Sequence, residues 1–85
     1  MKRWSDEAWN DYLYWQKQDK KTLKRINMLI KDIERNGLLH GIGKPEHLKY
    51  SPDYSRRIDE ENRLIYNQDA NGDLLIISCR GHYEE

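Results

Sequence analysis

The chain has 85 residues, which is enough for one domain with a small core, and we expect a single domain over residues 1–85. Fifteen Lys and Arg residues balance fifteen Asp and Glu residues, which excludes the net positive charge of a typical free RNA binder. Cys79 stands alone, and no apolar stretch is long enough to span a bilayer. These features exclude a disulfide framework and a membrane span, so we expect a soluble cytoplasmic protein.

The first helix is predicted to begin after Ser5, and Trp4 before it is a candidate for a short strand. Ser5 can cap the helix, because its side-chain oxygen can accept a hydrogen bond from the backbone of the first turn. Helical spacing places Trp9, Tyr12 and Leu13 on one side. We therefore expect these three residues to face the core.

A second helix is predicted after Asp19, which can cap it, and Asn36-Gly37 provides the signal for its end. Apolar residues recur along it every three or four positions and form one stripe, namely Leu23, Ile26, Ile30 and Ile33. Residues 17–25 contain five cations and one anion, which gives this run a local charge of +4. Such a run is either a solvated helix face or a face that contacts RNA.

Residues 37–53 are rich in Gly and Pro and predict a long loop, and long loops in compact domains are often functional. From residue 54 the pattern has a period close to two, and strands are predicted over 54–59, 63–66 and 74–79. Asn71-Gly72 predicts a hairpin turn before the last strand, which is apolar and therefore expected in the middle of the sheet. The fold class expected is α+β, with two N-terminal helices packed on an antiparallel sheet whose other face is open.

Arginine side chains on these strands are candidates for binding phosphate. Arg56 and Arg57 are adjacent, so they point to opposite faces of a strand, and the alternation places Arg57 on the polar face. Arg63 begins the next strand and can lie close to Arg57. A guanidinium group binds phosphate oxygens through two parallel hydrogen bonds and stays charged at any working pH. The alternative is that these arginines form ion pairs with acidic residues of segment 59–61.

Cleavage of RNA without a metal can use the neighbouring 2′-hydroxyl as nucleophile, and it requires a base, an acid and cations around the phosphate. Glu46, in the Gly/Pro-rich loop, is a candidate base, and its alternative interpretation is an ordinary surface glutamate. His82 is a candidate acid, because an imidazole gives and takes protons near neutrality, and its alternative is a frayed terminal residue. Lys44 and Lys49 can add positive charge, and Tyr83 can stack on a base.

No metal or cofactor is expected from the sequence. The histidines at 40, 47 and 82 lack the spacing of a zinc motif, and no cluster of carboxylates suggests a pair of magnesium ions. No glycine-rich phosphate loop precedes a helix.

The sequence resembles the YoeB-type toxins of the RelE superfamily, which are the toxin halves of bacterial toxin–antitoxin pairs. The resemblance covers nearly the whole chain and rests on motifs that match in order: Trp4-Ser5, Asp11-Tyr12-Leu13-Tyr14-Trp15, Ile30-Lys31-Asp32, Gly43-Lys44-Pro45-Glu46, Leu48-Lys49, Ser55-Arg56-Arg57-Ile58, Arg63-Leu64-Ile65-Tyr66 and His82-Tyr83. Together these motifs are specific, although no single one would be.

The resemblance implies a RelE-like, microbial-RNase-like fold and an mRNA endonuclease that works in the A site of the 70S ribosome. It also implies inhibition by a Phd/YefM-type antitoxin and frequent homodimer formation. The family's site residues map onto a general base at Glu46 and a general acid at His82. They place a transition-state stabiliser at Arg63, assisted by Lys49 and Arg57, and Tyr83 would complete the site.

Three departures from the family pattern affect the candidate site. His47 occupies the usual position of a proline, the link between Lys49 and Ser55 is shorter than usual, and Glu84-Glu85 extend past the usual terminal tyrosine. The alternative function is a non-cutting interaction protein of the RelE/ParE fold that binds an antitoxin or another target. The presence of the expected catalytic side chains argues against this alternative.

Overall fold

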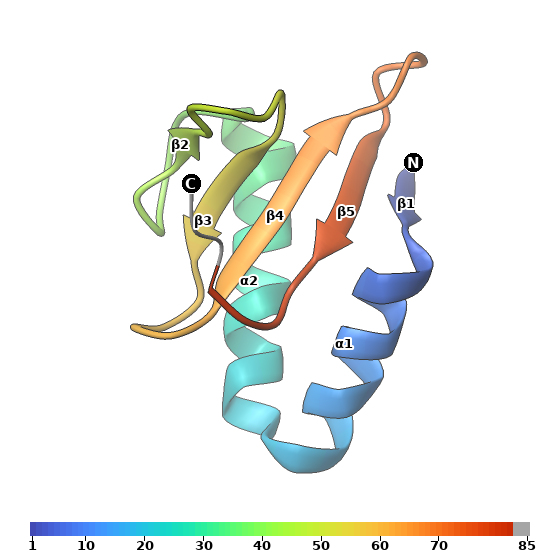
Figure 1. Ribbon diagram of the computed structural model, residues 1–85, viewed down its shortest axis with the longest axis vertical. Helices are drawn as coiled ribbons and strands as arrows, with labels where there is room; N and C mark the ends of the chain where they lie inside the picture. The colour runs from blue at the N-terminus through green and yellow to red at the C-terminus, as the bar shows by residue number, and fades with distance from the viewer. Residues whose placement is uncertain (83–85) are drawn as a thin grey trace.

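The computed structural model describes residues 1–82, in which two helices pack against one face of a five-stranded sheet (Figure 1). The elements in chain order are β1 (Lys2–Trp4), α1 (Asp6–Gln18), α2 (Lys20–Asn36), β2 (Glu46–His47), β3 (Tyr54–Arg57), β4 (Arg63–Gln68) and β5 (Leu74–Ser78). The strand order across the sheet is β1-β5-β4-β3-β2. The two helices and the α+β class are therefore as predicted.

The ends of both helices are set by the residues that the sequence indicated. The Ser5 hydroxyl accepts a hydrogen bond of 3.0 Å from the Ala8 amide at the start of α1. The Asp19 carboxylate accepts from the amides of Lys21 and Thr22 at the start of α2. The Gly37 amide donates to the Ile33 carbonyl at 2.8 Å and closes α2. These caps satisfy backbone groups that a helix leaves unpaired at its ends.

The main core lies between α2 and the sheet, as the predicted apolar stripe requires. Ile26, Ile30 and Ile33 are buried on α2, together with Leu29, whereas Leu23 is only half-buried. They pack with residues of the sheet and its flanks, chiefly Ile58, Leu64, Tyr66, Leu74, Ile76 and Cys79. In Figure 1, α2 runs behind β3 and β4. One face of the sheet is consequently covered by helix.

The prediction for α1 was wrong at two positions. Trp9 is 47% exposed and Leu13 is 42% exposed, whereas Ala8 is buried and Tyr12 packs at the margin of the core. The helix lies beside β1 and β5, so only a narrow strip of it reaches the core (Figure 1). The Trp9 ring instead stacks on Tyr12, with ring centroids 5.8 Å apart. The face of α1 that reaches the core carries Ala8, Tyr12 and Trp15, so the prediction placed the buried face too far round the helix, with Tyr12 at its edge.

The sheet is mixed, and not antiparallel throughout as the sequence suggested. β1 pairs in parallel with β5, and the Ser5 amide donates to the Ile76 carbonyl at 2.9 Å just after β1 ends. A strand of three residues carries too little alternation to reveal its partner or its direction. The prediction of a continuous loop over 37–53 was also wrong, because β2 pairs with β3 inside it through Glu46↔Ser55 and His47↔Tyr54.

Candidate active site

The register of the sheet places several of the predicted site residues on one face. Glu46 is paired with Ser55, and Ser55 is paired with Ile65, so these residues form one cross-strand row. Arg57 and Arg63 are paired with each other, two residues after Ser55 on β3 and two residues before Ile65 on β4. Because side chains alternate along a strand, all five point to the face opposite the helices. The predicted assignment of Arg57 to the polar face thus agrees with the observed register.

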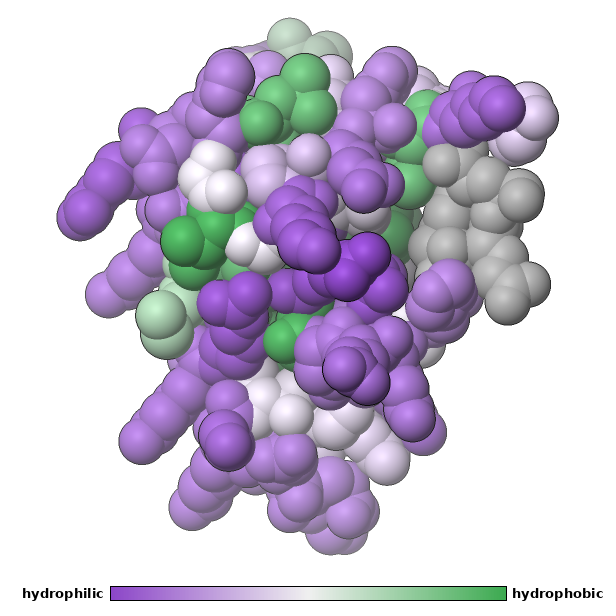
Figure 2. Space-filling model, turned by 90° about the vertical axis from the view of Figure 1, so that its left-hand side faces the viewer, coloured by the Kyte–Doolittle hydropathy of each residue, from purple (hydrophilic) through white to green (hydrophobic). Residues whose placement is uncertain are grey.

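A cavity of about 260 Å³ lies on this face. Residues from four separate parts of the chain line it: Lys44, Glu46, Leu48, Ser55, Arg57, Arg63 and His82. Its described lining carries three fixed cations and one carboxylate beside an imidazole, although the whole chain has no net charge. Figure 2 shows the side of the molecule that carries β2 and the 37–53 loop, where polar side chains predominate and hydrophobic ones form separate spots.

Two of the residues that line the cavity have little exposure. Leu48 and Ser55 are both buried, and Ile65, the strand partner of Ser55, is buried beside them on the same face of the sheet. Leu48 is held by a hydrogen bond of 2.9 Å from its amide to the Asp53 carbonyl, which closes the short link after β2. The side chain of His47 packs on Tyr54, with ring centroids 4.7 Å apart. Strand pairing and ring packing therefore both hold β2 against β3.

His82 reaches the cavity because the preceding residues are bound to the start of β4. The Gly81 amide donates to the Asn62 side chain at 2.8 Å, and the Arg63 amide donates to the Gly81 carbonyl at 3.0 Å. Asn62 is in turn held by the Asp59 carboxylate. Burial alone would raise the pKa of Asp59, but hydrogen bonds from Asn62 and Glu61 and the nearby charge of Arg63 lower it overall.

The arginines of the cavity form no side-chain ion pair with the acidic turn in the described part of the chain. The Arg63 side chain donates to the backbone carbonyls of Asp59, at 2.7 Å, and Asn62, at 3.1 Å. Across residues 1–82, the side-chain and N-terminal ion pairs join other groups, and neither Arg57 nor Arg63 takes part in them. Direct ion pairs of Arg57 and Arg63 with segment 59–61 are therefore not seen there, although Arg63 lies close enough to Asp59 for its charge to lower the pKa of that carboxyl.

Comparisons with known proteins identify the family. A profile of the YoeB-like toxin of bacterial type II toxin–antitoxin systems matches residues 4–83. A toxin YoeB from Escherichia coli strain K12 is 54% identical over 82 residues, which cover 94% of this chain and 95% of that protein. The chain belongs to the YoeB toxin family.

Solved structures agree with this assignment. YoeB in a heterotetrameric YoeB–YefM complex from Staphylococcus aureus has 50% identity and a TM-score of 0.88, covering 98% of this chain and 97% of that one. A YoeB dimer from the same organism has 49% identity and a TM-score of 0.89, covering 96% of this chain and 95% of that one. The RelE-like fold expected from the resemblance is therefore confirmed, and the chain is a YoeB-like toxin of a type II toxin–antitoxin system.

Some of the predicted site residues line the cavity, and others do not. Glu46, Arg63 and His82 line the cavity, as do Lys44 and Arg57. Lys49 is exposed just beyond β2, does not appear in the lining, and its ammonium lies 5.5 Å from the ring centroid of Tyr50. Tyr83, like Glu84-Glu85, lies outside the described residues.

Sequence reasoning missed residues that build the cavity without carrying charge. Ser55 could have been found, because the alternation already placed it on the same face as Arg57. Leu48 carried no such signal, since its burial depends on how the 48–53 link folds back. Asn62 was also missed, because its role in fixing Gly81 depends on a contact 19 residues away in the chain.

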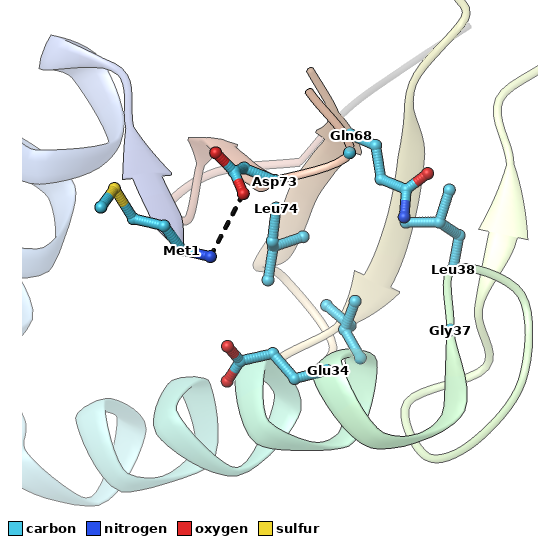
Figure 3. Close-up of a pocket in the computed structure, with 9 residues that line it drawn as sticks. Met1, Glu34, Gly37, Leu38, Gln68, Asp73 and Leu74 are labelled. Atoms are coloured by element: carbon cyan, nitrogen blue, oxygen red, sulfur yellow. Dashed lines mark hydrogen bonds and ion pairs between the residues drawn. The ribbon is translucent and has the colours of Figure 1, made fainter. Parts of the chain in front are cut away.

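A second cavity, of about 290 Å³, lies at the other end of the sheet between α2, β1 and the hairpin of β4 and β5 (Figure 3). The Met1 ammonium forms an ion pair with Asp73 across it, and Glu34 projects toward it from α2. It holds no imidazole and no arginine. Among residues 1–82, no three His, Cys, Asp or Glu side chains gather in a way that could hold a metal ion. No described helix is long and apolar enough to cross a membrane.

Proposed function

We propose that this YoeB-family chain is an endoribonuclease that cuts mRNA in the A site of the 70S ribosome. The observation that carries the proposal is the cavity in which Glu46, His82 and two arginines converge from separate segments. A carboxylate and an imidazole can act as a base and an acid, and fixed guanidinium groups can stabilise a phosphate as charge develops on it.

The reaction follows from these roles. Glu46 removes the proton from the 2′-hydroxyl, whose oxygen attacks the adjacent phosphorus. His82 donates a proton to the departing 5′-oxygen as the P–O bond breaks, so the products are a 2′,3′-cyclic phosphate and a 5′-hydroxyl. Arg63 binds the phosphate oxygens as negative charge builds on them, with Arg57 and Lys44 as further cations. Lys49 and Tyr83 are proposed to complete the site when RNA is bound.

The zero net charge of the chain supports a substrate that is held by the ribosome and not captured from solution. A protein with no net charge lacks the long-range attraction that concentrates free RNA at a binding site. A ribosome holds the mRNA in place, so the enzyme needs only local cations in the cavity. The proposed activity is therefore cytoplasmic, where ribosomes work.

The proposed partners follow the assemblies formed by relatives. The Staphylococcus aureus relatives are described as a YoeB–YefM heterotetramer and as a YoeB dimer. We propose that this chain likewise binds a Phd/YefM-type antitoxin that inhibits it, and that the free toxin forms a homodimer.

The test uses purified ribosomes that carry a defined mRNA, with primer extension to locate the cuts. The wild-type chain should cut at a fixed position relative to the A-site codon, and Glu46→Gln, Arg63→Gln and His82→Gln should each slow cleavage by about 10²–10⁴-fold. Glu60→Gln and His40→Gln are matched controls of the same chemical change outside the cavity.

A second arm tests the nucleophile. An mRNA with a 2′-deoxy group at the cut position should resist cleavage, because the attacking oxygen is missing. Undiminished cleavage of this substrate would exclude the hydroxyl mechanism. Absence of any cut by the wild-type chain, together with antitoxin binding, would favour the non-cutting interaction protein.

A further inference from the structure

Arg56 is a charged residue in the core, and it is fully buried. It follows Ser55 on β3 and precedes the cavity residue Arg57, and the alternation of the strand turns it toward the helices. All five of its N–H donors are used. Their acceptors are the Asp32 carboxylate, the Tyr66 hydroxyl at 3.0 Å and the backbone carbonyls of Ile42 at 3.0 Å, Gly37 at 2.8 Å and His40 at 2.7 Å.

Three of these acceptors belong to one segment, the backbone of residues 37–42 that follows α2. Two of the partners of Arg56 form further hydrogen bonds to the same segment. Asp32 accepts a hydrogen bond of 3.0 Å from the Ile42 amide, and the Tyr66 hydroxyl donates to the Leu38 carbonyl at 2.6 Å. A stretch with no helix or strand of its own is thus fixed by one guanidinium group and its two neighbours.

The fixed segment leads directly into the cavity. The Arg57 amide donates to the Gly43 carbonyl at 2.7 Å, and a β-carbon at Gly43 would lie 3.2 Å from the β-carbon of Arg56. The next residues are Lys44, which lines the cavity, and Pro45, followed by Glu46 on β2. Arg56 and Arg57 therefore act on opposite faces of one strand. Arg56 binds the loop on the helix side of the sheet, and Arg57 faces the cavity that the loop borders.

Stability alone is a poor explanation for this arrangement. Removing two opposite charges from water costs free energy that their attraction often fails to recover, and well-packed apolar residues are frequently as stable. The neighbours of Arg56 on the same face, Tyr54 and Ile58, contribute to the core without a charge. What an apolar residue at position 56 could not do is bind the carbonyl groups of the loop and fix its path.

We infer that Arg56 is a positioning residue, whose guanidinium group fixes the 37–43 loop and thereby sets the places of Lys44 and Glu46 in the cavity. The inference rests on the proposed function where it concerns catalysis. That Arg56 fixes the conformation of the loop is a separate claim, and it can be tested without measuring cleavage. Arg56 itself does not touch the substrate, because it lies within the core.

The first measurement is amide hydrogen exchange in Arg56→Lys. Lysine keeps the charge, but its three donors cannot reach five acceptors in the planar fork of arginine. The Ile42 and Arg57 amides should exchange faster, whereas the Ser5 amide, bound to Ile76 at the other side of the sheet, should keep its protection. Unchanged exchange at Ile42 and Arg57 would overturn the inference. Tyr66→Phe, which removes one acceptor, is a milder variant in case Arg56→Lys does not fold.

The second measurement is the single-turnover cleavage rate on ribosomes, at a temperature where every variant is folded. A displacement near 1 Å in a catalytic group can lower a rate by about 10²-fold, so Arg56→Lys should lose about 10–10²-fold. Ile26→Val, a buried change in the N-terminal half of α2, should cleave at the wild-type rate.

A double-mutant cycle separates positioning from general damage. The loss caused by Arg56→Lys should be smaller in the Glu46→Gln background, because the group that it positions has already been removed. Equal losses in both backgrounds would overturn the inference. If the wild-type chain does not cleave at all, the proposed function fails, and amide exchange alone decides whether Arg56 holds the loop.

Discussion

The close packing of the loop that leads to Glu46 can be measured by comparing two glycines with nearly the same backbone angle. Gly43 has a φ of 83° and Gly72 a φ of 80°, so alanine is conformationally disfavoured at both. A β-carbon at Gly43 would lie 2.8 Å from the Leu29 side chain and 3.3 Å from the Arg57 carbonyl oxygen. At Gly72 it would meet nothing within 4 Å. The two substitutions therefore share a backbone penalty and differ in packing.

The magnitudes follow from these two terms. A left-handed conformation costs a residue with a β-carbon about 1–2 kcal/mol, which is the whole effect expected for Gly72→Ala. Forcing an extra methyl group into a packed site costs about 1–3 kcal/mol more, so Gly43→Ala should lose about 2–5 kcal/mol. The free energy of unfolding of an 85-residue domain is about 4–13 kcal/mol, so this loss is a large part of the total.

The assay is urea denaturation followed by tryptophan fluorescence, for which the chain offers three tryptophans. Because small proteins lose about 1–3 kcal/mol per molar urea, the midpoint of Gly43→Ala should lie below that of Gly72→Ala by about 0.3–3 M at an unchanged slope. Equal midpoints for the two variants would refute the reasoning, because they would show that a methyl group fits at position 43 without a packing penalty.

Three further predictions concern buried or partly buried polar groups. Tyr66→Phe should lower the free energy of unfolding by about 1–3 kcal/mol in thermal melts, because it leaves a donor of Arg56 and the Leu38 carbonyl without their partner. A hydrogen bond from Arg56 lowers the pKa of Asp32, so this carboxylate stabilises the fold above the ordinary aspartate pKa of about 3.9, and the contribution is lost as the pH falls through the lower folded-state pKa. Asp32→Asn should remove that acid-side dependence. Burial raises the pKa of Cys79 to about 12, so the folded chain should not react with a thiol reagent at pH 8, and labelling should follow unfolding.

Each of these has a direct check. Tyr12→Phe removes a hydroxyl that bonds Asn27 at the surface, and it should change stability by less than about 0.5 kcal/mol, so an equal loss in both variants would contradict the role assigned to the buried hydroxyl. An acid titration of Asp32→Asn that matches the wild type would contradict the pKa argument. Rapid labelling of Cys79 under native conditions would show that it is open to reagent.

Local signals in the sequence were sufficient to predict the helices. Ser5, Asp19 and Gly37 act within a few residues of the helix ends that they cap, so each can be identified without knowledge of the tertiary structure. The exposure of Trp9 depends on where α1 sits relative to the sheet, which no local signal contains. The parallel pairing of β1 with β5 joins residues more than 70 positions apart, and for the same reason the sequence did not reveal it.

The candidate site was predictable to a different extent. Alternation along β3 separated Arg57 from Arg56, and the family resemblance named Glu46, Arg63 and His82, which the structure places in one cavity. The same alternation assigned Arg56 to the apolar face but gave it no partner. Its carboxylate partner lies 24 residues earlier on α2, and its carbonyl partners belong to a loop whose path the sequence did not specify.

The two adjacent arginines explain how a chain without net charge can still present a cationic cavity. The charge of Arg56 is matched by Asp32 on the helix side of the sheet, so it contributes little to the field on the opposite face. Arg57 and Arg63 receive no carboxylate partner within residues 1–82, and with Lys44 they outnumber the single carboxylate in the described lining by two charges. Positive charge is thus neutralised where it holds the loop and left available where a phosphate would bind, which is why the position of each cation matters more here than the total charge.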